Sequence, residues 1–169
     1  MIDERWERLR IAAEALRKRL PGAPRVALTL GSGLSDAFGV PDGGVLIPCD
    51  EIPGFPVPTV VGHAGDLWAG RIGGTPVVVQ RGRTHFYEGH SPDDVTFATR
   101  LFALVGAKTL VVTNASGAVS RDLRAGDLVL ITDHINMLGV NPLRGRNLEK
   151  LGPRFPDMSA AYTPRLRAL

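Results

Sequence analysis

The sequence predicts an α/β fold, a central sheet flanked by helices, as one domain over residues 1–169. Three observations support this fold class. Short apolar runs with strand character alternate with helical segments, two of these runs meet at Gly73-Gly74, and several end in Gly-rich or polar clusters. In such sheets, ligands bind beyond the carboxyl ends of the strands. The polar clusters at the strand ends are therefore the candidate site.

The first predicted element is an amphipathic helix over residues 3–20, which Pro21-Gly22 ends. Its apolar residues recur at helical spacing and are Trp6, Leu9, Ala13, Leu16 and Leu20. A short strand is expected over residues 25–30, and it leads directly into Gly31-Ser32-Gly33. Residues 45–61 contain four prolines, which predicts a mostly extended loop.

A β-hairpin is predicted where two apolar runs, 67–72 and 75–80, are joined by the two-residue glycine turn. A helix is expected to begin at Ser91, with Ser91 as N-cap and Pro92 at the first helical position. The expected buried face of that helix consists of Phe97, Leu101, Leu104 and Val105.

Two further buried strands are expected at residues 110–112 and 128–131, and each ends in a polar cluster. Thr163-Pro164 predicts the start of a last helix, and the sequence ends at Leu169 after about one turn. An isolated helix of that length is marginal in water, so we expect the chain to be truncated at its C-terminus.

Composition excludes several classes of protein. No apolar run approaches the roughly 20 residues that span a bilayer, so no membrane partner is expected. The one cysteine, Cys49, cannot form an internal disulfide, which favours a reducing compartment and a cytoplasmic location. One cysteine and four scattered histidines give no metal-ligand spacing, so no metal is expected.

The charge balance is mildly basic, at a formal +3, with basic residues concentrated in 4–25 and 144–167. A nucleic-acid-binding module is one interpretation of this pattern. Solvated helix faces, together with arginines that serve an anionic substrate, explain it better, so no nucleic acid is expected as a partner.

The run from Arg81 to His90 is the most informative cluster. Arg83 and His85 alternate, so in an extended segment they face the same side. A guanidinium fork beside an imidazole suits a tetrahedral oxyanion, which favours this interpretation over a charged edge strand. Tyr87 extends the same face with a ring and a hydroxyl. Glu88 is a candidate for orienting the loop.

Three other clusters leave alternatives open. Gly31-Ser32-Gly33 lets a backbone approach an anion, but tight turns of this kind also occur without a ligand. The small residues after Thr113 permit close approach of a substrate, or Asn114 forms a purely structural turn. Asp133-His134 is either a catalytic dyad or, as we favour, a structural pair. The frames of a nucleophile elbow, a phosphate loop and a dinucleotide fingerprint are absent from the sequence.

Taken together, these clusters resemble the trimeric class of purine nucleoside phosphorylases, within the purine nucleoside and methylthioadenosine phosphorylase family. The resemblance spans roughly residues 25–162. The matching motifs, in order, occupy residues 31–34, 62–65, 82–89, 113–117, 126–143 and 152–159. Each motif is weak by itself, but six in the same order make a specific pattern.

The resemblance implies a phosphorylase-type fold with a mixed, distorted sheet, a homotrimer, and reversible phosphorolysis of purine ribonucleosides. The products are free base and ribose 1-phosphate, and 6-oxopurines are the favoured bases. Phosphate is the co-substrate and no cofactor is implied. The implied phosphate contacts are Ser32, His63, Arg83, His85 and the backbone of Ala115, with Arg83 and His85 as the catalytic pair. Tyr87 would pack on the ribose, and Phe155 would reach into a neighbouring subunit's site.

The nearest alternative within the resemblance is a methylthioadenosine phosphorylase, although the stretch 133–143 looks more like the purine nucleoside enzymes. Two departures from the family matter. Residues 114–118 read Asn-Ala-Ser-Gly-Ala where the family usually has Asn-Ala-Ala-Gly-Gly. The family's base-reading residues would lie beyond Leu169, so an inactive truncated fragment is also an expectation.

Overall fold

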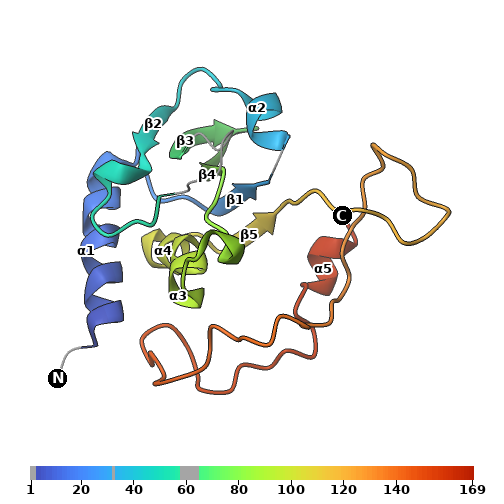
Figure 1. Ribbon diagram of the computed structural model, residues 1–169. Coiled ribbons are helices and arrows are strands. Elements are labelled where there is room, and N and C mark those ends of the chain that lie inside the picture. Colours follow the sequence, from blue (N-terminus) through green and yellow to red (C-terminus); the bar gives the residue numbers. More distant parts are fainter. Residues whose placement is uncertain (1–2, 32, 58–64) are drawn as a thin grey trace. The chain divides into compact units, whose positions relative to one another are not determined.

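The computed structural model describes residues 3–31, 33–57 and 65–169. The chain divides into two compact units, one up to Ala115 and the other Ser116–Leu169. The first unit contains the sheet and the helices that pack on it (Figure 1). The second is a series of turns and loops with the short helix α5, Pro164–Arg167. The expected single domain over residues 1–169 stays a prediction.

The sheet has five strands in the order β2-β3-β4-β1-β5. Their bounds are β1 Val26–Leu30, β2 Val45–Pro48, β3 Asp66–Ile72, β4 Thr75–Arg81 and β5 Thr109–Val112. Strand β1 is parallel to both β4 and β5, whereas β2, β3 and β4 are antiparallel neighbours. The predicted mixed sheet is confirmed. Because β1, β4 and β5 run the same way, their carboxyl ends share one edge of the sheet.

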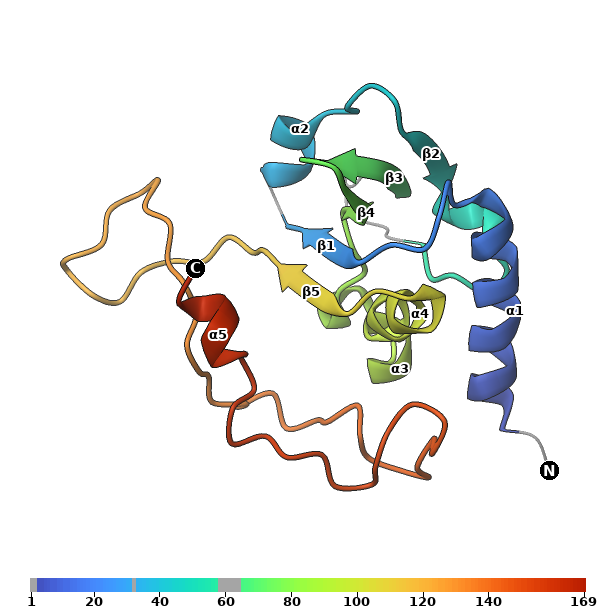
Figure 2. The same ribbon diagram turned by 180° about the vertical axis from the view of Figure 1, so that it is seen from behind.

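Helices lie on both sides of this sheet. In the first unit they are α1 Glu4–Arg19, α2 Leu34–Phe38, α3 Pro92–Val95 and α4 Phe97–Val105. Figures 1 and 2 show α2 on one side of the strands and α3 and α4 on the other. Helix α1 packs against α4. Two 3₁₀ turns, Cys49–Glu51 and Phe86–Glu88, follow β2 and β4.

The core has a layer on each face of the sheet, as strand alternation requires. On the side of α2, Trp68 is fully buried with Leu30, Val77 and Val79, and Phe38 meets the Trp68 ring edge-on at 5.6 Å between centroids. The helices α1 and α4 bury a second set of apolar residues, which are Leu9, Ala12, Ala13, Leu16, Phe97, Ala98, Leu101, Phe102 and Val105. The central sheet flanked by helices is therefore confirmed.

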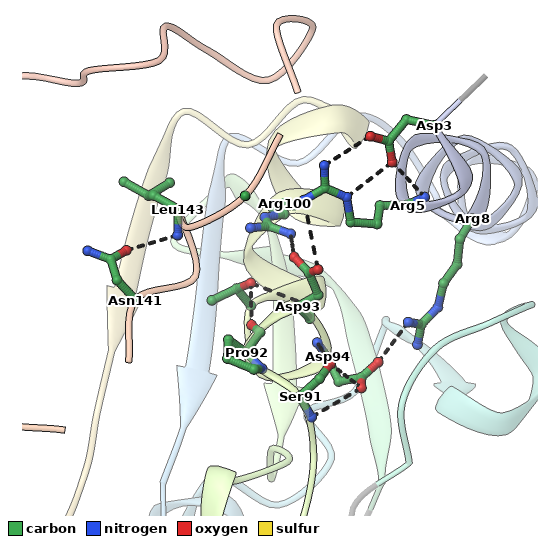
Figure 3. Close-up of polar contacts among 12 residues, drawn as sticks. Asp3, Arg5, Arg8, Ser91, Pro92, Asp93, Asp94, Arg100, Asn141 and Leu143 are labelled. Atoms are coloured by element: carbon green, nitrogen blue, oxygen red, sulfur yellow. Dashed lines mark hydrogen bonds and ion pairs between the residues drawn. The ribbon is translucent and has the colours of Figure 1, made fainter. Parts of the chain in front are cut away.

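Ion pairs tie the start of α1 to α3 (Figure 3). Arg8 donates 2.7 Å hydrogen bonds to Asp94 Oδ1 and to the carbonyl of Gly54. Asp93 accepts from Arg100 at 2.6 Å. Ser91 caps α3 as predicted, because its hydroxyl accepts the Asp94 N–H at 3.2 Å. This network fixes the position of the chain just after the candidate site.

The structure differs from several expectations about the elements. Phe97, Leu101 and Val105 are buried on α4 as predicted, but Leu104 is only half-buried and Phe102 is buried in addition. Within the stretch 45–61, predicted to be mostly extended loop, residues 45–48 form the strand β2 because they pair with β3. Residues 128–131 do not form a strand in the described second unit, and Leu128 is 96% exposed.

The expected strand at 110–112 forms within β5, but it is exposed and not buried as predicted. Leu110, Val111 and Val112 are 40%, 44% and 55% exposed. The reason is position, since β5 is the last strand of the described sheet and pairs only with β1.

Among the described residues, no helix has both the length and the apolar character needed to cross a membrane.

Candidate oxyanion-binding site

Arg83 follows the end of β4 by two residues and is half-buried. Its Nη1 donates a 2.6 Å hydrogen bond to the carbonyl of Thr113, just after β5. Between strand and arginine, Gly82 has φ +83°, a conformation that favours glycine. The turn at Gly82 thus directs the guanidinium along the sheet edge toward the end of β5.

Burial lowers the pKa of the Arg83 guanidinium below its ordinary value, and the charge interaction with Tyr87 opposes this shift. Arginine stays protonated in proteins, so the group is a half-buried cation. Its hydrogen bond to the Thr113 carbonyl fixes the orientation of this cation. The arginine is therefore a positive charge held in a defined orientation, as the recognition of an anion requires.

His85 is held by a buried carboxylate. Glu88, whose side chain is 2% exposed, accepts the His85 backbone N–H on Oε1 at 2.7 Å. The same oxygen lies 2.8 Å from His85 Nδ1. An ionised carboxylate there favours the proton on Nδ1, so Nε2 is the ring nitrogen that carries the lone pair. The expected role of Glu88 in orienting this loop is confirmed in its geometry.

Tyr87 stacks on His85, with ring centroids 4.7 Å apart and an angle of 16° between the planes. The tyrosine is 74% exposed, so most of its ring is available for packing against another molecule. Tyr87 therefore lies beside His85, one of the two predicted anion contacts.

The glycine loop after β1 approaches the same place. The Gly31 N–H donates to Thr113 Oγ1 at 2.9 Å. A Cβ at Gly31 would lie 2.6 Å from the Thr113 carbonyl oxygen and 2.9 Å from Asn114 Cα. Only glycine permits so close an approach of the two backbones. Segments after β1, β4 and β5 thus meet at Thr113, as expected for clusters at the carboxyl ends of parallel strands.

The remaining predicted site residues are distributed as follows. Ser32 and His63 lie outside the described residues. Ala115 is exposed two residues beyond Thr113, and its carbonyl accepts from the Asn114 side chain at 3.4 Å. Phe155 belongs to the second unit, where it is 87% exposed, with the Arg154 guanidinium 5.9 Å from its ring centroid.

Asp133 and His134 do not form a carboxylate–imidazole dyad. Asp133 Oδ1 accepts the backbone N–H of His134 at 2.9 Å. The His134 ring instead meets the hydroxyl of Tyr162, 3.0 Å from Nδ1. The two side chains therefore form neither the catalytic dyad nor the side-chain pair considered from the sequence.

Sequence reasoning missed two contributors, Thr113 as the meeting point and His90 beside Glu88. His90 Nε2 lies 3.9 Å from Glu88 Oε2. The sequence feature that could have indicated the His90 contact is the spacing of the two histidines, three residues before and two residues after Glu88. The part of the chain that the structure describes contains no group of three or more His, Cys, Asp or Glu residues suited to a metal ion.

The fold is thus an α/β protein with a mixed sheet, whose parallel strands bring a half-buried arginine and a carboxylate-held imidazole to one edge, an arrangement whose chemistry suits an oxyanion. The family model of the phosphorylase superfamily matches residues 25–169, and the chain belongs to that superfamily.

The similar curated proteins given below are named as purine nucleoside phosphorylases. The chain is 49% identical over 158 residues to purine nucleoside phosphorylase 1 of Geobacillus stearothermophilus, covering 94% of this chain and 58% of the relative. It is 47% identical over 163 residues to purine nucleoside phosphorylase 1 of Bacillus subtilis, covering 96% and 60%. The chain thus spans about 60% of the length of these curated relatives.

Solved structures of purine nucleoside phosphorylases also match this chain. A purine nucleoside phosphorylase in complex with ribose-1-phosphate matches with a TM-score of 0.87 at 41% identity, over 99% of this chain and 63% of that one. The Schistosoma mansoni enzyme in complex with inosine matches with a TM-score of 0.86 at 42% identity, over 96% and 58%. The expected phosphorylase-type fold is confirmed.

Proposed function

We propose that this chain supplies the phosphate site of a purine nucleoside phosphorylase. The reaction is reversible phosphorolysis of purine ribonucleosides, with 6-oxopurines favoured, to free base and ribose 1-phosphate. The observation that supports it best is the placement of Arg83 and the His85–Glu88 pair beyond β4, next to the loops after β1 and β5. The names of the relatives point to the same chemistry.

Arg83 and His85 are the proposed catalytic contacts to phosphate. Arg83 offers charged N–H donors, and His85 offers Nε2, which accepts from a P–OH group or donates when the ring is protonated. Ser32, His63 and the backbone of Ala115 complete the proposed phosphate contacts. Phosphate is the co-substrate, and the proposal needs no other cofactor and no metal.

The bound phosphate stabilises the charge that develops on the sugar during the reaction. Glycosidic cleavage develops positive charge on the ribose ring, much as in glycoside hydrolysis. An anion about 4 Å away is worth about 4 kcal/mol at an effective dielectric near 20. This energy corresponds to an increase in the cleavage rate on the order of a thousandfold. Phosphate then forms the new bond to C1 of the ribose as the bond to the purine nitrogen breaks.

The ribose contacts and the assembly belong to the same proposal. Tyr87 packs on the sugar, because its exposed ring lies beside His85. Phe155 reaches a neighbouring subunit's sugar within a homotrimer, and its 87% exposure in the second unit supports a role outside its own core. A cytoplasmic location suits a chain with one buried free cysteine.

Two measurements test the proposal. Phosphate binding to the 169-residue chain is followed by ³¹P NMR, with sulfate and chloride as comparison anions. Phosphorolysis is followed as phosphate-dependent release of hypoxanthine from inosine, by this chain and by the native protein should it be longer. Methylthioadenosine is the comparison substrate. Phosphate binding no tighter than chloride binding, together with no phosphate-dependent base release by either protein, would overturn the proposal.

A further inference from the structure

His90 lies beside the carboxylate that holds His85. Its Nε2 is 3.9 Å from Glu88 Oε2, and the histidine side chain is 21% exposed. Within the described part of the chain, this nitrogen is buried and has no hydrogen-bond partner. The same carboxylate holds His85 through Oε1. Two imidazoles thus flank one buried carboxylate.

The backbone fixes His90 in this place from both sides. Gly89 ends the 3₁₀ turn with φ +91°, a left-handed conformation that folds the chain back over Glu88. Ser91 then begins α3, and its side chain and backbone bond to Asp94 (Figure 3). Arg8 in turn anchors Asp94 to α1. His90 is the single residue between a glycine turn and an anchored helix cap, so it has little freedom to leave Glu88.

This position gives His90 an effect on His85 through Glu88. A buried carboxylate is costly unless N–H groups and positive charge surround it. At 3.9 Å, His90 Nε2 and Glu88 Oε2 are too far apart for a hydrogen bond, so His90 acts on Glu88 through electrostatics: an N–H dipole directed at Oε2 favours the ionised form of the carboxyl group. Ionised Glu88 in turn accepts from His85 Nδ1 and so sets the tautomer of that ring. A neutral, protonated Glu88 would instead be able to donate to Nδ1, which would place the His85 proton on Nε2.

We propose that His90 is a positioning residue that keeps His85 in its Nδ1–H tautomer by keeping Glu88 ionised. The consequence for phosphate rests on the proposed function: Nε2 of His85 then accepts the P–OH proton of hydrogen phosphate, which the opposite tautomer cannot do. His90 itself touches neither phosphate nor nucleoside in this scheme.

The test uses the whole 169-residue chain and two substitutions, His90→Phe, which removes the donor, and His90→Gln, which restores an N–H donor of similar reach. Ring ¹⁵N shifts of His85, assigned with His85→Gln, report its tautomer at one fixed neutral pH, and ³¹P NMR reports phosphate affinity. We expect His90→Phe to shift His85 away from the Nδ1–H form and to weaken phosphate binding about two- to fivefold, less than the loss of a full hydrogen bond to a charged group. His90→Gln should restore both readouts.

An unchanged His85 tautomer in a folded His90→Phe chain would overturn the inference, and so would a His90→Gln chain that behaves like His90→Phe. Should His90→Phe fail to fold, His90→Ala takes its place with the same expectations. The tautomer does not depend on phosphate. A wild-type chain that binds no phosphate, but whose His85 tautomer responds to His90→Phe, would therefore refute the proposed function and leave the positioning role standing.

Discussion

The guanidinium of Arg83 donates a 2.6 Å hydrogen bond to the backbone carbonyl of Thr113, which joins the segment after β4 to the segment after β5. The Thr113 hydroxyl accepts the N–H of Gly31 and so joins the segment after β1 as well. One threonine therefore connects the ends of three parallel strands. The arginine is held before any ligand arrives, and such preorganisation lowers the entropy that a binding site loses on binding.

Arg83→Gln should weaken phosphate binding more than tenfold, because a charge-assisted hydrogen bond contributes about 1.5–3 kcal/mol. In the active protein the same change should raise the KM for phosphate and lower kcat. The matched control is Arg71→Gln, in the β3–β4 hairpin, where the arginine bonds to the Gly74 carbonyl. Titration with phosphate measures both variants. Equal affinities for the two would contradict the assignment of Arg83.

Gly31→Ala should destabilise the chain by about 1–3 kcal/mol, the usual cost of forcing a methyl group into packed atoms. The reason is that the new Cβ would lie 2.6 Å from the backbone oxygen of Thr113, which cannot rotate away. Gly22→Ala is the control, since a methyl group there would meet no atom within 4 Å and the φ of Gly22 is not left-handed. Urea unfolding compares the two, and a Gly31→Ala chain as stable as Gly22→Ala would refute the close approach.

The Asp94 carboxylate should contribute stability that acid removes. Burial by itself would raise the pKa of Asp94, but hydrogen bonds from Ser91 and Arg8 and the charge of Arg8 outweigh it, so the pKa lies below the ordinary 3.8. A carboxyl group with a lowered folded-state pKa stabilises the fold above its unfolded value and loses that effect as pH falls through the folded value.

Asp94→Asn should therefore be less stable than wild type at pH 7, and the difference in unfolding free energy between the two should narrow below about pH 4. The exposed Asp42 provides the control Asp42→Asn. Urea unfolding across this pH range gives the free energies. A gap that stays constant with pH would show that the Asp94 ion pair does not contribute in this way.

Mixed oligomers test the assembly proposed for Phe155. Phe155→Ala subunits lack the proposed aromatic contact, and Arg83→Gln subunits lack the phosphate contact. Mixing the two in the active protein should create some sites with Arg83 from one subunit and Phe155 from its neighbour. Inosine phosphorolysis should then exceed the sum of the separate variants. Activity no greater than that sum would speak against shared sites.

The sequence predicted the local elements of the first unit well, and the reasons are local. Helix α1 lies within the predicted residues 3–20, and α3 begins at the predicted cap. The hairpin turns at Gly73-Gly74, with φ +54° and +77°, as two adjacent glycines permit. Periodicity, caps and turn residues act within a few positions of the chain, so the residue types suffice to predict them.

The types of the candidate site residues could also be predicted, because a guanidinium, an imidazole and glycine-rich strand ends suit an oxyanion in any fold. The groups that hold these residues in place could not be predicted. Arg83 and Thr113 are 30 positions apart and meet only because β1 lies between β4 and β5. The contact between His90 and Glu88 depends on the left-handed turn at Gly89.

By itself, then, the sequence determined the fold class, the helices and hairpin of the first unit, and the chemical nature of the candidate site. The tertiary structure alone decided the strand order, the exposure of β5, the burial of Phe102 on α4 and the meeting of three strand ends at Thr113. The physical reason is that pairing and burial depend on neighbours distant in the chain, whereas propensity, capping and side-chain chemistry belong to each residue and its nearest neighbours.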